Sequence, residues 1–196
     1  MLEIWLIRHG QTDWNVVNRI QGWTDVPLNA TGVKQAEELA DRLVGMKFRA
    51  LYSSTLSRAV QTAEQIAAKT NLEIIMDARL RERSYGDCEG RYQLQRDRMP
   101  VPCKDEESKQ ALCSRVMEAL SDMTQSYASG TVLCVTHGGV IRSVLNALGK
   151  TDVPRITNAS ISVIGYTKKQ FTPLGGSQMN TRTRPSRDER DLFLQY

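Results

Sequence analysis

The chain begins with LEIWLIRHG (residues 2–10), an apolar run that ends in an Arg-His-Gly motif. A second apolar run ends in a similar way, as CVTHGG (residues 134–139), and these two motifs contain both histidines of the chain. Apolar runs of this kind are typical of buried parallel strands, and ligands of open α/β sheets bind just beyond the carboxyl ends of such strands. His9 and His137 are therefore predicted to face one crevice.

Helical and strand patterns alternate along the chain, which predicts βαβ units and the α/β fold class. The expected architecture is a three-layer αβα sandwich with a mostly parallel central sheet. Helices are expected at residues 31–44, after an N-cap at Thr55, at 108–127 and at 140–148. Strands are expected at residues 2–7, 48–53, 72–76, 131–135 and 161–166, with the last at an edge of the sheet because Lys168 and Lys169 follow it.

The length of 196 residues, with 40% apolar and 24% charged residues, predicts a single globular domain that spans residues 1–196. Residues 91–109 contain two prolines and many charges, so we expect an irregular insert over the active site. Residues 175–196 are polar and are expected to form a C-terminal tail.

Composition limits the expected partners and surroundings. No leader-like segment precedes the first strand, and no apolar run approaches the roughly 20 residues that cross a bilayer, so we expect a soluble cytoplasmic protein without membrane contact. The net charge of +4 is spread along the chain, which disfavours nucleic acid as a partner. No metal-ligand spacing is present, and neither a metal nor a cofactor is expected. The cysteines form no C-x-x-C pair and are expected to be reduced thiols: Cys88, Cys103, Cys113 and Cys134.

Three segments carry residue types suited to the chemistry of phosphate esters. In the first, a neutral His9 imidazole is a good nucleophile, and the planar guanidinium of Arg8 can bind phosphoryl oxygens. In the second, Arg58 falls in the first turn of an expected helix, where a bound anion would offset the unfavourable helix dipole. In the third, LRERSYGDCEG (residues 80–90), one of three acids could protonate a leaving alkoxide. The alternatives are a surface charge for Arg8 and solvated acids in the loop.

In order and spacing these motifs resemble the histidine phosphatase superfamily, in the branch that includes cofactor-dependent phosphoglycerate mutases and related small-molecule phosphatases. The resemblance runs from Leu2 to the region of Gly149, and it implies a phosphoglycerate mutase-like fold. It rests on LIRHGQTDWN (6–15), QG (21–22), DVPL (25–28), Gly32, QA (35–36) and SSTLSRAVQTA (53–63).

The resemblance also implies roles for particular residues. His9 would be the residue that becomes phosphorylated, and Glu82 would serve as both acid and base. Phosphate would be bound by Arg8, Arg58 and His137. The positions implied to complete the substrate pocket are Asn15, Gln21, Gly22 and Gly138.

Two departures from the family pattern bear on the substrate. Ser84 stands where the mutases carry histidine, and Cys88 stands where related phosphatases carry tryptophan. The insert after Gly90 is also short compared with that of the mutases, and a shorter cover admits water, which favours hydrolysis.

The sequence therefore predicts a metal-independent phosphatase that hydrolyses small phosphomonoesters through a phosphohistidine at His9. Its expected partner is a small phosphorylated metabolite, and self-association into a homo-oligomer is left open. The alternatives are a cofactor-dependent phosphoglycerate mutase, which would share the catalytic residues, and a non-catalytic module that binds phosphorylated ligands. Basic residues of the insert are candidates for binding a second anionic group, with a solvated charged loop as the alternative reading: Arg91, Arg96, Arg98 and Lys104.

Overall fold

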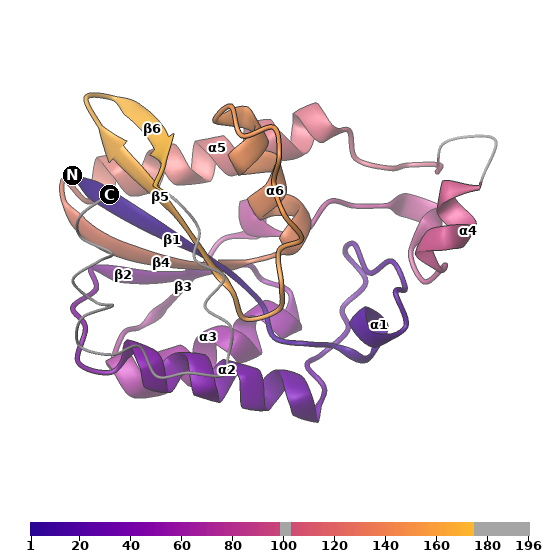
Figure 1. Cartoon of the computed structure of the whole chain (residues 1–196), viewed down its shortest axis with the longest axis horizontal. Coiled ribbons are helices and arrows are strands. Elements are labelled where there is room, and N and C mark those ends of the chain that lie inside the picture. The colour runs from indigo at the N-terminus through magenta and orange to yellow at the C-terminus, as the bar shows by residue number, and fades with distance from the viewer. Residues whose placement is uncertain (99–102, 175–196) are drawn as a thin grey trace.

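The structure is a computed structural model that describes residues 1–98 and 103–174, so the expected tail at 175–196 lies outside it. A six-stranded sheet with the order β3-β2-β4-β1-β5-β6 forms the centre of the described part (Figure 1). Its strands are β1 (Leu2–Arg8), β2 (Ala50–Ser53), β3 (Ile74–Met76), β4 (Gly130–Thr136), β5 (Ile161–Thr167) and β6 (Gln170–Pro173).

Helices cover both faces of this sheet. The helices α2 (Ala30–Leu43) and α3 (Ser57–Thr70) lie on one face, and α5 (Lys109–Ser126) and α6 (Gly138–Ala147) lie on the other (Figure 1). Each pair buries its apolar stripe in a core of its own, with Leu39 and Ile66 in one core and Val116 and Val144 in the other. The predicted three-layer α/β fold is confirmed. The shorter helices are α1 (Asp13–Val16), α4 (Gln93–Asp97) and the 3₁₀ turns Ala78–Leu80 and Gly86–Cys88.

Strand β1 lies inside the sheet and sets the position of the site. It runs parallel to β4, with Arg8 opposite Thr136, and β4 in turn runs parallel to β2. Because Arg8 and Thr136 are the last residues of paired strands, the residues that follow them, His9 and His137, leave the sheet side by side. The buried parallel strands predicted from the two apolar runs are thus neighbours.

Strand β5 is not the edge strand that the sequence predicted. It pairs antiparallel with β1 on one side and with β6 on the other. Lys168 and Lys169 have φ angles of 48° and 63°, and the pairing of Thr167 with Gln170 makes them a two-residue hairpin turn. Such turns need a left-handed conformation at both central residues, so the two lysines mark a turn and not the margin of the sheet. The edge strand on this side of the sheet is β6, which ends at Pro173.

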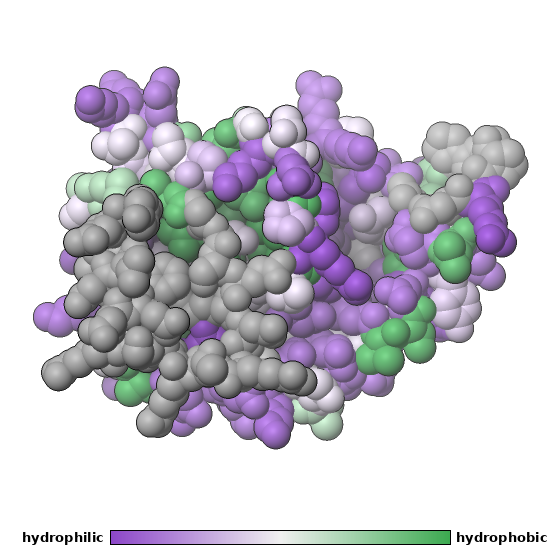
Figure 2. Space-filling model, in the orientation of Figure 1, coloured by the Kyte–Doolittle hydropathy of each residue, from purple (hydrophilic) through white to green (hydrophobic). Residues whose placement is uncertain are grey.

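The described part of the insert is more regular than expected. It contains α4, and its backbone is tied to the segment after α1: Ile20 N donates to Arg91 O at 2.9 Å, and Gln93 N donates to Asn18 O at 3.0 Å. The helices α1 and α4 lie on the same side of the molecule, on the right of Figure 1. Apolar surface is exposed there in Figure 2, and Val16, Val17 and Leu94 are among its exposed side chains.

Cys88 and Cys103 form a disulfide, which corrects the expectation that every cysteine is a reduced thiol. Asp87 N donates to Lys104 O at 3.2 Å, and Lys104 N donates to Asp87 Oδ1 at 2.8 Å, so the two segments lie against each other. This contact brings the Cα atoms of the two cysteines to 5.6 Å across a sequence separation of 15. Cys113 and Cys134 are free.

No helix of residues 1–98 and 103–174 combines the length and the apolar character needed to cross a bilayer.

Candidate active site

The two histidines meet beyond the carboxyl ends of β1 and β4, as predicted. Their ring centroids are 5.2 Å apart with an angle of 59° between the planes, and His9 N donates to Thr136 O at 3.0 Å. A cavity of about 340 Å³ opens beside them. Of the residues that the sequence singled out, those on its described wall are Arg8, His9, Asn15, Gln21, Gly22, Arg58, Glu82 and Gly138. His137 lies behind this wall and is fully buried.

His9 is held in the form that a nucleophile requires. Its Nδ1 lies 2.6 Å from the carbonyl oxygen of Gly10, which can only accept, so Nδ1 carries the hydrogen and Nε2 keeps its lone pair. Burial lowers the pKa of His9 well below its usual value, and the nearby charges of Arg58 and Arg8 lower it further. The imidazole is therefore neutral at physiological pH.

His137 is fixed by its second nitrogen. Its Nε2 lies 2.8 Å from Ser54 Oγ, a side chain that follows β2. Its Nδ1 is buried and has no hydrogen-bond partner among the described residues. Burial lowers the pKa of His137 well below its usual value, and Arg58 and His9 add to this effect.

Arg58 lies in the first turn of α3, as predicted, with 1% of its surface exposed. Its Nη1 donates to Thr24 O at 3.0 Å and its Nη2 donates to Gly22 O at 2.7 Å. Thr55 does not cap this helix: the N-cap is Leu56, which has no side-chain cap bond. The carboxyl group of Asp25 takes over this function, since its Oδ1 accepts from Ser57 N at 2.7 Å and from Ser57 Oγ at 2.8 Å.

Arg8 is tied to the segment between α6 and β5. Its Nη1 donates to Ile156 O at 2.6 Å. Burial lowers the pKa of Arg8 to about 10, and the charges of Arg155 and Arg58 act in the same direction, while Glu82 opposes them. The guanidinium still carries its charge at neutral pH, in surroundings that an anion would make more favourable.

Buried nitrogen atoms that have no partner in the described part of the chain collect at this point, and two of them are guanidinium N–H donors. Arg8 Nε, Arg58 Nε and His137 Nδ1 are all buried, and none has a hydrogen-bond partner among the described residues. Buried polar atoms are almost always bonded, so donors without a partner indicate a group that the protein itself does not supply. Two guanidinium groups beside two neutral imidazoles suit a dianion such as a phosphoryl group.

Glu82 faces these donors across the pocket. Its Oε2 accepts from Gly139 N at 3.0 Å and its Oε1 accepts from Arg83 N at 2.8 Å. A Cβ at Gly139 would displace the Glu82 carboxyl group from this position, so the glycine allows the close contact. Of the three acids of residues 80–90, Glu82 alone lies on the described pocket wall.

The other two acids of that loop have structural contacts. Glu89 accepts from the backbone of Trp23, Thr24 and Tyr85 at 2.7–3.0 Å, and Asp87 accepts from Lys104 N. Glu89 therefore fastens the loop to the segment after α1.

Several residues that sequence reasoning missed hold the first motif in place. Asn158 Nδ2 donates to His9 O, to Gly10 O and to Asn15 Oδ1 at 3.0–3.1 Å, and Thr62 Oγ1 accepts from Gly10 N at 3.1 Å. No pattern distinguished Asn158 from other polar loop residues. Gly10 is required for packing, because a Cβ there would strike the carbonyl group of Gly32 in α2.

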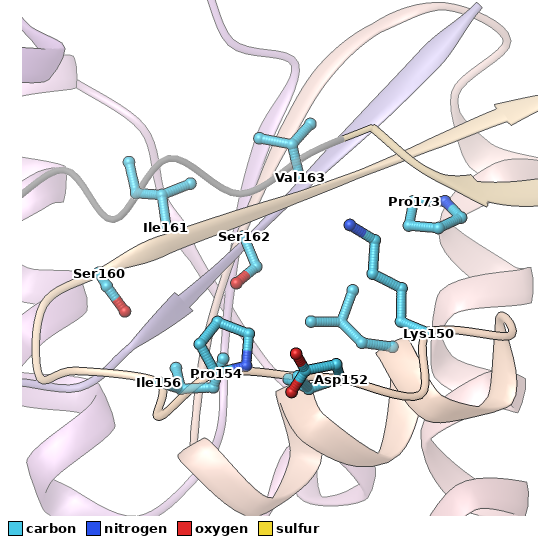
Figure 3. A pocket seen from close by; sticks show the side chains of 11 residues that line it. Lys150, Asp152, Pro154, Ile156, Ser160, Ile161, Ser162, Val163 and Pro173 are labelled. Carbon is cyan, nitrogen blue, oxygen red and sulfur yellow. The ribbon is translucent and has the colours of Figure 1, made fainter.

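A second cavity, of about 120 Å³, lies between β5 and the segment after α6 (Figure 3). Its wall includes Ser162, Val163 and Pro173, and the charged residues among its described lining are Lys150 and Asp152. It shares Ile156 with the larger pocket but contains none of the residues described above as candidates for chemistry.

The donor set of the main pocket does not suit a metal ion, because its charged side chains are guanidinium groups and the carboxyl group of Glu82. Within the described residues, Asp87, Cys88 and Cys103 are the one group of three side chains close enough to share a metal. The two sulfur atoms of that group are bonded to each other.

The main pocket thus brings together a buried histidine whose Nε2 keeps its lone pair and two arginines with N–H donors that the described structure leaves unused, Arg8 and Arg58. A family model described as the histidine phosphatase superfamily (branch 1) matches residues 4–175, and the chain belongs to this superfamily. The resemblance seen in the sequence is confirmed. At the general level, membership places the chain among phosphatases and mutases, with hydrolase as the supported class.

Relatives and solved structures agree with this assignment. The uncharacterized phosphatase PhoE of Bacillus subtilis (strain 168) is 35% identical over 177 residues, which cover 87% of this chain and 92% of PhoE. The probable phosphoglycerate mutase GpmB of Proteus mirabilis (strain HI4320) is 34% identical over 189 residues, which cover 85% and 86%. The structure of YhfR from Bacillus stearothermophilus aligns with a TM-score of 0.81 at 31% identity, covering 88% of this chain and 95% of YhfR.

Proposed function

We propose that the protein is a metal-independent phosphatase that hydrolyses small phosphomonoesters through a phosphohistidine at His9. The observation that carries the proposal is the state of His9: its Nδ1 is bonded to Gly10 O, so its Nε2 keeps a lone pair, and His9 shares a pocket wall with Arg8 and Arg58, whose buried Nε atoms have no partner among the described residues. The names of similar proteins, a phosphatase and a probable phosphoglycerate mutase, are consistent with phosphoryl transfer.

In the first step, the lone pair of His9 Nε2 attacks phosphorus, and the bond from phosphorus to the ester oxygen breaks. Arg8, Arg58 and His137 Nδ1 stabilise the charge on the phosphoryl oxygens, and Glu82 gives its proton to the leaving alkoxide.

In the second step, water attacks phosphorus and the bond to Nε2 breaks. Glu82 takes a proton from the water, and inorganic phosphate leaves. The covalent intermediate divides one difficult displacement into two easier ones. Asn15, Gln21, Gly22 and Gly138 complete the pocket wall around the phosphoryl group.

The test is to trap the intermediate. After rapid mixing with a phosphodonor and quenching in base, mass spectrometry should find one phosphoryl group on the peptide that contains His9. His9→Ala should retain the fold, accept no phosphoryl group and lose turnover, whereas exposed Lys47→Ala should behave as wild type. A chelator should leave the rate unchanged. Residual turnover of His9→Ala within tenfold of wild type would overturn the proposal.

A phosphoglycerate mutase would form the same phosphohistidine but would return its phosphoryl group to the substrate instead of releasing it to water. A mutase primed with 2,3-bisphosphoglycerate would interconvert 2- and 3-phosphoglycerate faster than it releases inorganic phosphate. A phosphatase would release phosphate from 3-phosphoglycerate faster than it forms the other isomer. Measuring both rates on one sample decides between the two, and a binding module would show neither.

A further inference from the structure

The main pocket holds more positive charge than one phosphoryl group uses. The arginines of its described wall are Arg8, Arg19, Arg58, Arg142 and Arg155. Glu82 is the acid on the same described wall. Arg8 and Arg58 are the arginines that the proposed function assigns to the phosphoryl group, so the positive charge of the other three is additional to that assignment. Like charges gathered in one pocket repel each other, and a bound anion relieves that repulsion.

Arg142 lies on α6, four residues after Gly138, so both residues are on the face of the helix that borders the pocket. Its Nη1 donates to Val153 O at 3.1 Å, and its Nη2 is 3.5 Å from Pro154 O. The side chain is exposed to solvent. These bonds hold the guanidinium against the segment that leads to Arg155.

Arg155 is held at a defined place on the rim. The backbone on one side of it is tied to Arg142 through Val153 O, and on the other side it is tied to Arg8 through Ile156 O at 2.6 Å. Arg155 is exposed, and its charge acts on the guanidinium of Arg8. Its charge is therefore placed next to the phosphoryl site and on the same side as Arg142.

We propose that Arg142 and Arg155 form a second anion site on the pocket wall, which selects phosphomonoesters that carry another anionic group near the ester. This inference rests on the proposed function, because the phosphoryl group must occupy the inner end beside His9. A guanidinium pair suits a carboxylate or a second phosphate, since each offers paired oxygens to paired N–H groups.

The described basic side chains of the insert do not line the main pocket. Arg91 donates through Nε to Asp87 O at 3.1 Å and lies 3.7 Å from the Asp87 carboxylate. Of the described residues, neither Arg91, Arg98 nor Lys104 is on the pocket wall. The side chain of Arg96 lies outside the described part.

The test measures binding without turnover, in the His9→Ala background. Calorimetry compares 3-phosphoglycerate with glycerol 3-phosphate, which differ by a carboxylate in place of a hydroxymethyl group. We expect 3-phosphoglycerate to bind roughly tenfold more tightly, the size of one charge-assisted hydrogen bond. A third ligand, glycerol 1,3-bisphosphate, distinguishes a site for carboxylate from a site for a second phosphate.

Matched variants locate the effect. Arg155→Gln should remove most of the preference for 3-phosphoglycerate, and Arg142→Gln should reduce it. Arg49→Gln removes the same charge from an exposed position next to the amino end of β2, opposite the pocket, and should retain the preference. Higher salt should narrow the difference, because the outer arginines are exposed to solvent.

The inference is overturned if the two ligands bind equally, or if the preference survives in both Arg142→Gln and Arg155→Gln. Hydrolysis by wild type without any preference would remove the second site and keep the phosphatase. If 3-phosphoglycerate binds with a clear preference but wild type forms no phosphohistidine and has no turnover, the second anion site is retained and the proposed phosphatase function is overturned.

Discussion

Arg115 and Glu107 form a bidentate salt bridge: Arg115 Nε donates to Glu107 Oε1 at 2.6 Å, and Arg115 Nη2 donates to Glu107 Oε2 at 2.8 Å. The same guanidinium reaches the loop that carries Glu82. Its Nη1 donates to Arg79 O and to Arg81 O at 2.6 and 2.7 Å, and its Nη2 donates to Glu82 O at 2.9 Å. One side chain of α5 thus fixes the backbone beneath the proposed acid, which makes Arg115 a positioning residue.

Arg115→Gln should therefore impair the acid step. The loop carbonyls lose their donor, and displacement of a catalytic group by about 1 Å can cost roughly 10²-fold in rate. We expect kcat to fall by about that factor on alkyl phosphates and by less on an aryl phosphate, whose good leaving group needs little protonation. The measurement is kcat on both substrates, well below the melting temperature of the variant. An equal fall on both, or no fall, would contradict the positioning role.

Glu82→Gln tests the acid directly. The amide cannot transfer the proton, so hydrolysis of alkyl phosphates should slow by roughly 10²- to 10⁴-fold, and hydrolysis of an aryl phosphate should slow less. Asp87→Asn is the matched control, because Asp87 is exposed and its Oδ1 bonds to Lys104 N away from the pocket. Comparable losses on both substrates would show that Glu82 has another role.

The Cys88–Cys103 disulfide should be visible in solution. Thiol titration of the unreduced, denatured protein should count two thiols, Cys113 and Cys134, and reduction should raise the count to four. Closing a loop across a separation of 15 residues stabilises the fold by roughly 3 kcal/mol, so Cys103→Ser should lower the free energy of unfolding by about that amount. Urea unfolding measures the change, with Cys113→Ser as the control. Four thiols without reduction would mean that the bond does not form.

The two buried histidines should make stability depend on pH. In the folded protein burial lowers the pKa of both rings well below 6.5, while the unfolded chain binds protons near pH 6.5. Above that pH both states are neutral and the rings contribute no pH dependence. Below pH 6.5 the unfolded state binds protons at these histidines and the folded state does not. As the pH falls, the free energy of unfolding therefore decreases by up to about 1.4 kcal/mol per pH unit for each histidine.

His137→Gln removes one of these titrations and should flatten the slope of unfolding free energy against pH between about pH 6 and pH 5. Carboxyl groups that titrate nearby are common to variant and wild type, so their effects cancel in the comparison of slopes. Identical slopes would mean that His137 is protonated in the folded protein.

The sequence itself determined the alternation of the main strands and helices along the chain and the meeting of the two histidines, but not the strand β6 or the short helices α1 and α4. Hydrophobic periodicity is a local property of the sequence. The apolar runs before Arg8 and before His137 therefore predict buried parallel strands whose carboxyl ends lie at the same edge of the sheet. The sequence also predicted which types of residue line the pocket. A guanidinium group can bind an anion and a neutral imidazole can act as a nucleophile in any fold, so these properties can be inferred from residue type.

Contacts between distant segments were decided by the tertiary structure alone. Burial leaves donors of Arg8, Arg58 and His137 without partners, and it lowers the pKa of both histidines. The joining of Cys88 to Cys103 depends on two loops that meet in space. The placement of Arg142 and Arg155 on the wall of the pocket that contains His9 depends on how α6 and the segment before β5 pack. Sequence spacing encodes neither burial nor the approach of distant residues, since both arise only when the whole chain is packed.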